Sequence, residues 1–408
     1  MNIFFKNKDY RTMLINQWIS SFGDTIFYLA LINYVSPYAF APLAVLCITI
    51  SETVPQILQV FTGALADFQN NRIKKYTVIA GIKFALYALL TIIIGSSEFN
   101  LFTVFVICSI NIISDTLSYF AGAMITPIYI RVIDEDMTSA MGFRQATANT
   151  VNVLSNTVGA LLIGILSIEA FVAVNALTFL IALLGILTIK NHLMEVEESI
   201  DVVHKKTSIK SLVNHIKTSL LALKQYPVII ELLLISVFSQ VILSSLLPMA
   251  TLLLLDSPFY SLETAQSIAI LSIFLFLGSV LGNLLSGSYL KTFSTRLTLF
   301  IGQLTRLAIV LGFFYESYLV VLVSSLFCAV TVGVVSPRIS KYMFTLIPEN
   351  MIGTVQSGLA AVSLVIPGVI TMGIIGVAST VGFKSASVAL LIIIMVVFFI
   401  LNRTKDLD

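Results

Sequence analysis

Charged residues are scarce in this chain. Only 11% of its 408 residues are charged, whereas 58% are hydrophobic. A soluble domain is usually ~25% charged, so this composition excludes an ordinary soluble fold. Apolar runs of the ~20 residues needed to cross a bilayer recur from one end of the chain to the other. The sequence therefore predicts a polytopic helical membrane protein.

Residue types that carry chemistry are also few. The three cysteines lie inside apolar runs and the three histidines fall in one hydrophilic stretch, so neither a disulfide framework nor metal-ligand spacing is expected. No glycine is directly followed by lysine, which excludes a nucleotide-binding P-loop. We therefore expect no cofactor, no metal, no nucleic-acid partner and no enzymatic activity. Any transport would be driven by an ion gradient, worth ~2.3 kcal/mol per charge per 100 mV.

The apolar runs predict twelve spanning helices, six on each side of one long hydrophilic gap. This arrangement gives an N-terminal half at 1–190, a cytoplasmic linker at 191–226 and a C-terminal half at 227–408. Lysines and arginines outside the spans gather in the two tails and the even-numbered gaps, so the positive-inside rule places both termini in the cytoplasm. The predicted spans are 12–35, 41–66, 74–95, 101–130, 139–166, 170–190, 227–254, 263–290, 297–314, 318–344, 351–377 and 385–402.

The linker contains a pattern typical of an amphipathic helix. Its apolar residues recur at helical spacing, with lysines on the other faces, which favours a helix lying on the inner leaflet. A plain charged linker is the alternative. The residues that share the apolar face are Ile209, Leu212, Val213, Ile216 and Leu220.

The two halves are related. "VIDEDMTSAMG" before the fifth span resembles "LIPENMIGTVQ" before the eleventh, and "TGALADFQNNRIKK" after the second span lies where "SGSYLKTFSTRLTL" lies after the eighth. Repeated halves are typical of transporters, which bind substrate near the bilayer midplane. The predicted fold class is an all-α integral membrane protein with twelve transmembrane helices in two pseudo-symmetric six-helix halves.

The segment "GALADFQNNRIKK" between the second and third spans resembles the loop motif of the major facilitator superfamily, Gly-x-x-x-Asp followed by bases. Asparagines replace the usual loop glycine, and asparagine tolerates the left-handed conformation that a turn needs. The resemblance implies an inner gate in which the motif aspartate pairs with Arg131 at the end of the fourth span. The residues that match the motif are Gly63, Asp67, Arg72, Lys74 and Lys75.

The opening "NKDYRTMLINQWISSFGDTIFYLAL" and the segment "IPENMIGTVQSGLAAVSLVIPG" resemble the macrolide-efflux and siderophore-export branch of this superfamily. The resemblance implies a bacterial cytoplasmic-membrane exporter, a monomer that exchanges protons for an amphipathic drug-like, macrolide-like or siderophore-like molecule. Such activity confers multidrug resistance. The antiporter motif Gly-Pro-x-x-Gly-Gly of the fifth span is reduced here to "SNTVGA", in which only Gly159 matches.

Three acids lie inside predicted spans. Asp24, Glu52 and Asp115 are about 11–15 residues from a span end, near the bilayer middle at ~1.5 Å per residue. A charge there costs ~2.5–3.5 kcal/mol and usually marks function. An apolar environment favours the neutral carboxyl, so these groups could carry protons or attract a cation; a structural pairing of Asp24 with Lys83 is the alternative. The polar residues expected beside them in the cavity are Gln17, Tyr28, Gln56, Asn111 and Gln240.

Arg338 and Lys341 lie one turn apart near the inner end of the tenth span. We interpret them as snorkelling to lipid phosphates or as an inner-gate ion pair, with a site for an anionic siderophore as the alternative. "GSVLG" at 278–282 predicts a close helix contact. Two other functions remain open: a proton-coupled importer of the same fold, and a transport-inactive sensor or immunity protein.

Overall fold

The computed structural model describes residues 2–67, 69–96, 98–133, 137–163, 165–198, 227–286, 294–346 and 352–403. Within these residues twelve helices have at least 20 residues, and one short helix precedes them. The predicted all-helical fold with six long helices on each side of the central gap is confirmed. The helices are α1 (Asn2–Lys6), α2 (Lys8–Val35), α3 (Ala41–Asp67), α4 (Arg72–Ser96), α5 (Leu101–Ile133), α6 (Met137–Leu162), α7 (Ile168–Glu198), α9 (Pro227–Asp256), α10 (Thr264–Ser286), α11 (Thr295–Phe314), α12 (Tyr318–Leu346), α13 (Ile352–Thr380) and α14 (Phe383–Arg403).

Ten of these helices are long and apolar enough to cross a membrane by composition alone; α2 and α6 are not among them. Both carry polar and charged residues within the length of a span, including Asp24 in α2 and Arg144 in α6. The two helices pack against each other. Polar side chains are tolerated in a span when they face protein instead of lipid, which explains the low hydropathy of this pair.

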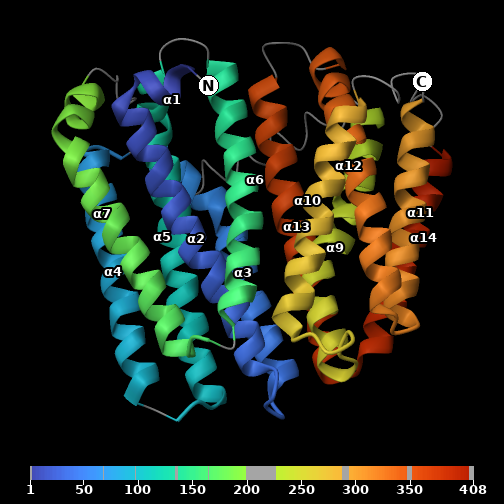
Figure 1. Cartoon of the computed structure of the whole chain (residues 1–408). Helices are drawn as coiled ribbons and strands as arrows, with labels where there is room; N and C mark the ends of the chain where they lie inside the picture. Colours follow the sequence, from blue (N-terminus) through green and yellow to red (C-terminus); the bar gives the residue numbers. More distant parts are fainter. Residues whose placement is uncertain are drawn as a thin grey trace. The chain divides into compact units, whose positions relative to one another are not determined.

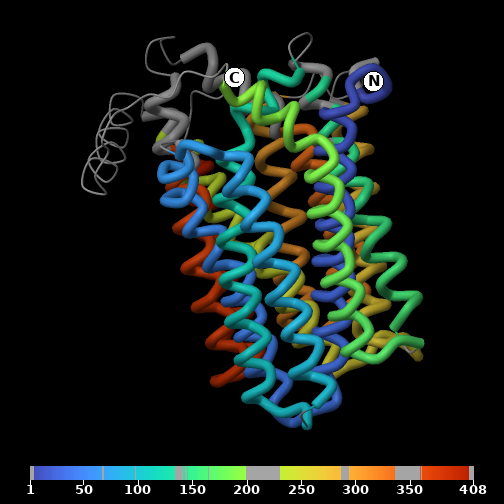
Figure 2. The backbone as a smooth tube through the Cα atoms, turned by 90° about the vertical axis from the view of Figure 1, so that its left-hand side faces the viewer, coloured from blue at the N-terminus to red at the C-terminus, as the bar shows by residue number. Residues whose placement is uncertain are grey.

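The helices form two compact units. The first contains α1, α2, α3 from Ile50 onward, α4, α5, α6 and α7. Within it α7 packs against both α2 and α4 along their length, and Figure 2 shows α2 and α7 running side by side. A buried cluster that includes Tyr10, Ile128 and Leu193 joins α2, α5 and α7 near the N-terminal end of α2.

The second unit contains the start of α3 through Thr49 together with α9 to α14 (Figure 1). Its packing repeats that of the first unit: α9–α13, α9–α14, α11–α14 and α11–α12 correspond in order to α2–α6, α2–α7, α4–α7 and α4–α5. These four helix pairs are therefore in contact at equivalent positions in both halves. This agreement confirms the internal repeat that the weak sequence similarity predicted.

The "GSVLG" segment makes the close contact expected of it. A Cβ atom at Gly282 would lie 2.2 Å from the carbonyl oxygen of Val330 in α12, and one at Gly278 would lie 2.4 Å from that of Leu326. These separations leave no room for a side chain. Small residues thus allow the backbones of α10 and α12 to approach closely, as in other membrane helix pairs.

Helix α7 is longer than the predicted span 170–190. It continues to Glu198 and so includes the first eight residues of the segment predicted as linker. The amphipathic helix predicted after it lies outside the described residues. The predicted division into 1–190, 191–226 and 227–408 stays a prediction.

Candidate functional site

Three membrane-embedded acids come together in the first unit. Asp24 lies on α2, Glu52 on α3 and Asp115 on α5. All three side chains are partly exposed. They are near enough for the charges of Asp24 and Glu52 to act on Asp115. Residues separated by up to 91 positions therefore form one cluster, which we call the acidic cluster.

Asp24 is held by a buried asparagine of α7. The Nδ2 atom of Asn175 donates a hydrogen bond to Asp24 Oδ1 over 3.1 Å, and Asn175 is fully buried. The neighbouring Gly23 makes this contact possible, because a Cβ atom there would lie 2.4 Å from Asn175 Oδ1 and 2.2 Å from Thr178 Oγ1. The close approach of α2 to α7 thus positions the carboxylate. The sequence reasoning missed Asn175, although an asparagine in the apolar run "AVNALTF" was a usable signal.

Glu52 is positioned by a two-step hydrogen-bond chain. Tyr87 donates its hydroxyl hydrogen to Asn111 Oδ1 over 3.0 Å, and Asn111 Nδ2 donates to Glu52 Oε1 over 2.9 Å. The amide of Asn111 is thereby oriented with its oxygen toward α4 and its nitrogen toward α3. Asn111 and Tyr87 are buried, whereas Glu52 is partly exposed. The predicted cavity residue Asn111 therefore lies in the acidic cluster as a hydrogen-bonding partner of Glu52.

Lys83 of α4 is the cation of the cluster. Its charge acts on both Asp24 and Asp115. It forms no direct ion pair with a carboxylate of the described residues; its Nζ atom lies 3.9 Å from the centre of the Phe179 ring instead. A desolvated ammonium over an aromatic face gains ~2 kcal/mol or more. The charges of Asp24 and Lys83 therefore act on each other without direct contact, and the lysine ammonium packs against the ring of Phe179.

The other predicted cavity residues are spread more widely. Tyr28 of α2 lies where the charge of Glu52 acts on it, and Gln56 of α3 is exposed one turn beyond Glu52. Gln17 accepts a hydrogen bond of 3.1 Å from Arg144 Nε, so it contacts a base of α6. Gln240 belongs to the second unit, where it is exposed and donates to Ser244 Oγ over 3.3 Å.

The loop motif is held within the first unit by a residue that the sequence did not single out. The carboxylate of Glu197, near the end of α7, accepts hydrogen bonds from the backbone N–H groups of Arg72 at 2.5 Å and Ile73 at 3.2 Å. It caps the first turn of α4, where unsatisfied N–H groups and the helix dipole favour an anion. Glu197 lies in "EVEES", which was interpreted as linker, so its role depends on the extension of α7.

The turn before α4 has the expected backbone. Asn71 has φ of +54°, the left-handed conformation that asparagine tolerates. Arg72 Nε donates to Gln69 O over 2.9 Å and Lys75 Nζ to Gln69 Oε1 over 2.6 Å. Of the predicted gate residues, Gly63 lies within α3, and Lys74 and Arg131 are exposed. The side chains of Asp67, Arg338 and Lys341 lie outside the described part of the chain, so the predicted Asp67–Arg131 pair stays a prediction.

These features define a helical membrane protein built of two repeated six-helix units, with the acidic cluster in the first. The family model of the Major Facilitator Superfamily matches residues 13–371. The chain therefore belongs to the major facilitator superfamily and is a membrane transporter, not an enzyme. No curated protein matches the chain.

Solved structures of transporters share the fold. A crystal structure of a mutant of the nucleoside transporter NupG has a TM-score of 0.65 and 12% identity, covering 96% of this chain and 98% of its own. The peptide transporter POT in complex with sulfate has a TM-score of 0.67 and 12% identity, covering 97% and 95%. A D-xylose-proton symporter has a TM-score of 0.61 and 15% identity, covering 97% and 98%. At these identities the likeness is one of fold.

Proposed function

We propose that this transporter is a proton-driven exporter of an amphipathic small organic molecule, drug-like, macrolide-like or siderophore-like, working by alternating access. The acidic cluster carries the proposal. Three carboxyl groups and one ammonium share a region of the membrane-embedded helices, and three ionised acids against one lysine would leave a charge of −2 there. Each uncompensated charge is costly in an apolar setting, by ~2.5–3.5 kcal/mol on insertion scales. Protonation removes that charge.

Proton exchange follows from this charge balance. When water reaches the partly exposed carboxyl groups they release protons, and when the surroundings are dry the neutral forms are favoured. A change of access to water therefore changes the number of bound protons, which is what coupling to a proton gradient requires. Asn175 and Asn111 support this exchange, because their amides donate hydrogen bonds to the carboxyl groups of Asp24 and Glu52 and hold them in place.

The cluster also favours a class of cargo. Its acids attract cations, and the exposed amide of Gln56 and the ring of Tyr28 lie near Glu52. A neutral or cationic amphipathic molecule suits these groups better than an anion does. Proton-coupled uptake is the second candidate, because the same cluster serves a symporter and one of the similar structures is a D-xylose-proton symporter.

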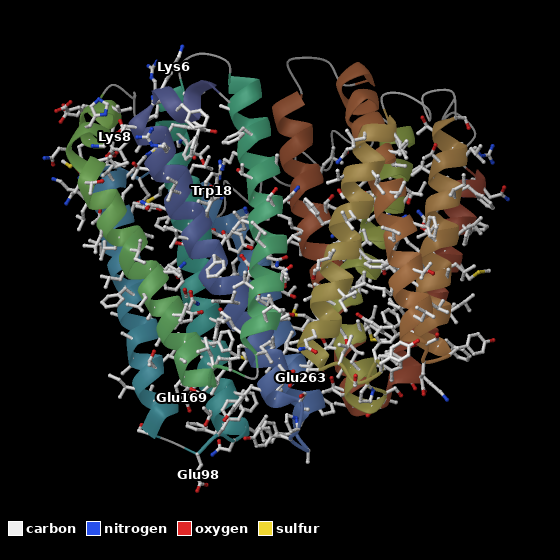
Figure 3. All side chains as sticks on the ribbon, in the orientation of Figure 1. Lys6, Lys8, Trp18, Glu98, Glu169 and Glu263 are labelled. Carbon is white, nitrogen blue, oxygen red and sulfur yellow. The ribbon has the colours of Figure 1, made fainter. Side chains whose placement is uncertain are left out.

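We also propose that the transporter lies in a bacterial cytoplasmic membrane with both termini in the cytoplasm. In the first unit Lys6 and Lys8 lie at one end of the helices and Glu98 and Glu169 at the other (Figure 3). Bases gather on the cytoplasmic side of membrane proteins. The end with Lys6 and Lys8 is therefore assigned to the cytoplasm.

The test compares Asp24→Asn and Asp115→Asn with Asp256→Asn, the same change at an exposed aspartate at the end of α9. A compound panel on cells with and without the chain first selects a probe, for example a macrolide antibiotic. Proteoliposomes with a trapped pH dye then report probe-dependent proton flux. We expect Asp24→Asn to abolish uphill export but to keep exchange down a probe gradient, and Asp256→Asn to behave as the native protein.

Other outcomes separate the alternatives. If Asp24 only balances Lys83, Asp24→Asn lowers expression and the additional change Lys83→Met restores it, because removing one member of a buried charge pair costs ~3–5 kcal/mol. Probe entry driven by an inward proton gradient identifies an importer. Full proton-coupled export in both Asp24→Asn and Asp115→Asn refutes the coupling role.

A further inference from the structure

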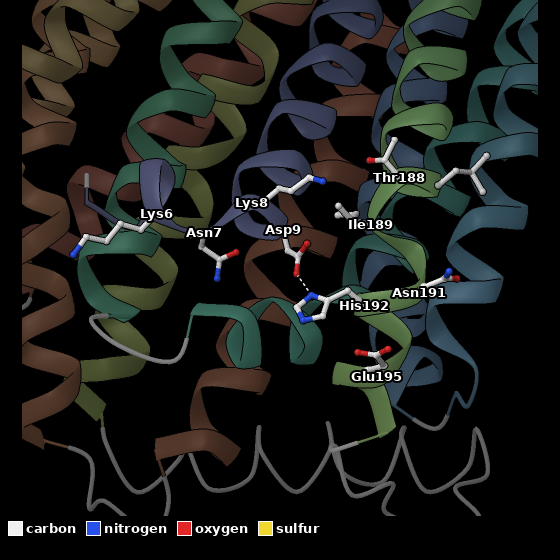
Figure 4. Close-up of a pocket in the computed structure, with 10 residues that line it drawn as sticks. Lys6, Asn7, Lys8, Asp9, Thr188, Ile189, Asn191, His192 and Glu195 are labelled. Carbon is white, nitrogen blue, oxygen red and sulfur yellow. Dashed lines mark hydrogen bonds and ion pairs between the residues drawn. The ribbon is translucent and has the colours of Figure 1, made fainter.

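A polar cavity lies at the N-terminal end of α2, away from the acidic cluster. Its volume is about 650 Å³. The ends of α1, α2 and α7 form its walls, so it belongs entirely to the first unit (Figure 4). Its lining residues are Lys6, Asn7, Lys8, Asp9, Leu187, Thr188, Ile189, Asn191, His192 and Glu195.

Some charged side chains of this cavity have a partner among the described residues, and others do not. The carboxylate of the buried Asp9 contacts the ring nitrogen Nδ1 of His192. Lys6 and Lys8 are exposed, and no described residue forms an ion pair or a hydrogen bond with either ammonium group. Glu195 lies two positions beyond Leu193 along α7, on the far side of His192 from Thr188 (Figure 4). The part of the cavity beside Lys8 and Thr188 therefore has available positive charge.

The cavity lies where a lipid-facing surface ends. Helix α7 exposes an apolar residue at each of four successive turns: Leu177 at 53%, Ile181 at 50%, Leu184 at 54% and Leu187 at 44%. This stripe lies within the apolar span of α7 and leads directly to the cavity, whose lining begins with Leu187. Beyond Leu187 the exposed residues become polar, with Thr188, Asn191 and His192. This order matches the change from acyl chains to headgroups in a bilayer.

We propose that the cavity binds the headgroup of an anionic glycerophospholipid. The phosphate lies against the ammonium group of Lys8, and an acyl chain follows the stripe from Leu187 to Leu177. Lys6, whose side chain points away from that of Lys8 (Figure 4), adds attraction at longer range. Basic pockets beside membrane-spanning helices are suited to such headgroups. A zwitterionic headgroup has no net charge, so the two lysines attract it less strongly.

The experiment titrates the purified full-length protein in detergent with lipid and counts bound lipid by native mass spectrometry. Phosphatidylglycerol is compared with phosphatidylcholine of the same acyl chains and with inorganic phosphate. The test variant is Lys6→Gln with Lys8→Gln. The matched control is Lys74→Gln with Arg403→Gln, which removes two exposed positive charges outside the cavity. All four residues are exposed, so folding should be preserved; a thermal melt checks this.

We expect the native protein to retain phosphatidylglycerol in preference to phosphatidylcholine. The Lys6/Lys8 variant should bind phosphatidylglycerol roughly 30-fold more weakly, about fivefold for each lysine near an anionic lipid, and the control should change less than twofold. Equal losses in the two variants, equal retention of the two lipids, or full displacement of phosphatidylglycerol by millimolar inorganic phosphate would each overturn the proposal. The last result would assign the cavity to a free anion.

Discussion

The cap that Glu197 places on α4 leads to a quantitative prediction. Glu197→Gln preserves the size of the side chain but removes its charge and one of its two acceptor oxygens. The carboxylate accepts from Arg72 N at 2.5 Å and Ile73 N at 3.2 Å. A hydrogen bond to a charged group contributes ~1.5–3 kcal/mol, and an anion at a helix N-terminus adds ~0.3–1 kcal/mol. We expect the change to destabilise the first turn of α4 by roughly 2–3 kcal/mol.

Hydrogen exchange measures this loss directly. Since ~1.4 kcal/mol is a factor of ten in an equilibrium constant, amides at the start of α4 should exchange roughly 30- to 100-fold faster in the variant. Mass spectrometry of peptides covering Arg72 to Lys75 reports the rate. The control is Glu198→Gln, the same change at the next residue, which is exposed. Equal protection of these peptides in the two variants would refute the cap. Under the proposed function Glu197→Gln should also slow transport at unchanged expression, because the loop motif begins at this turn.

Two further predictions concern packing and topology. Gly282→Ala should destabilise the protein by ~1–3 kcal/mol or more, since overpacking forces α10 away from the Val330 carbonyl; Gly373→Ala, where no atom lies within 4 Å, should be neutral or stabilising by up to ~1 kcal/mol. Equal melting temperatures of the two purified variants would contradict the contact. After replacement of Cys47, Cys108 and Cys328, an impermeant thiol reagent should label Glu98→Cys in intact cells and Lys74→Cys only after permeabilisation. Labelling of Lys74→Cys from outside would reverse the proposed orientation.

The number and order of the long helices could be predicted from the sequence, because each apolar run of about 20 residues satisfies the length of a bilayer by itself. The conformation of Asn71 could also be predicted, since it depends on the local backbone. The position of three acids, Asp24, Glu52 and Asp115, inside the spanning helices could also be predicted, and the cost of charge in lipid is the reason to propose a function for them. All these conclusions rest on properties of single segments.

The partners of those acids were decided by the tertiary structure alone. Asn175 is 151 positions from Asp24, and Glu197 is 125 from Arg72. Helical periodicity assigns a side chain to a face, but it does not say which residue of another helix lies opposite. The packing of α7 against both α2 and α4 brings these distant groups together. The same packing places Lys83 over Phe179, whereas the sequence left a structural pairing with Asp24 open as the alternative. The sequence alone therefore determined the helices and their embedded charges, and only the contacts between helices decided which groups those charges meet.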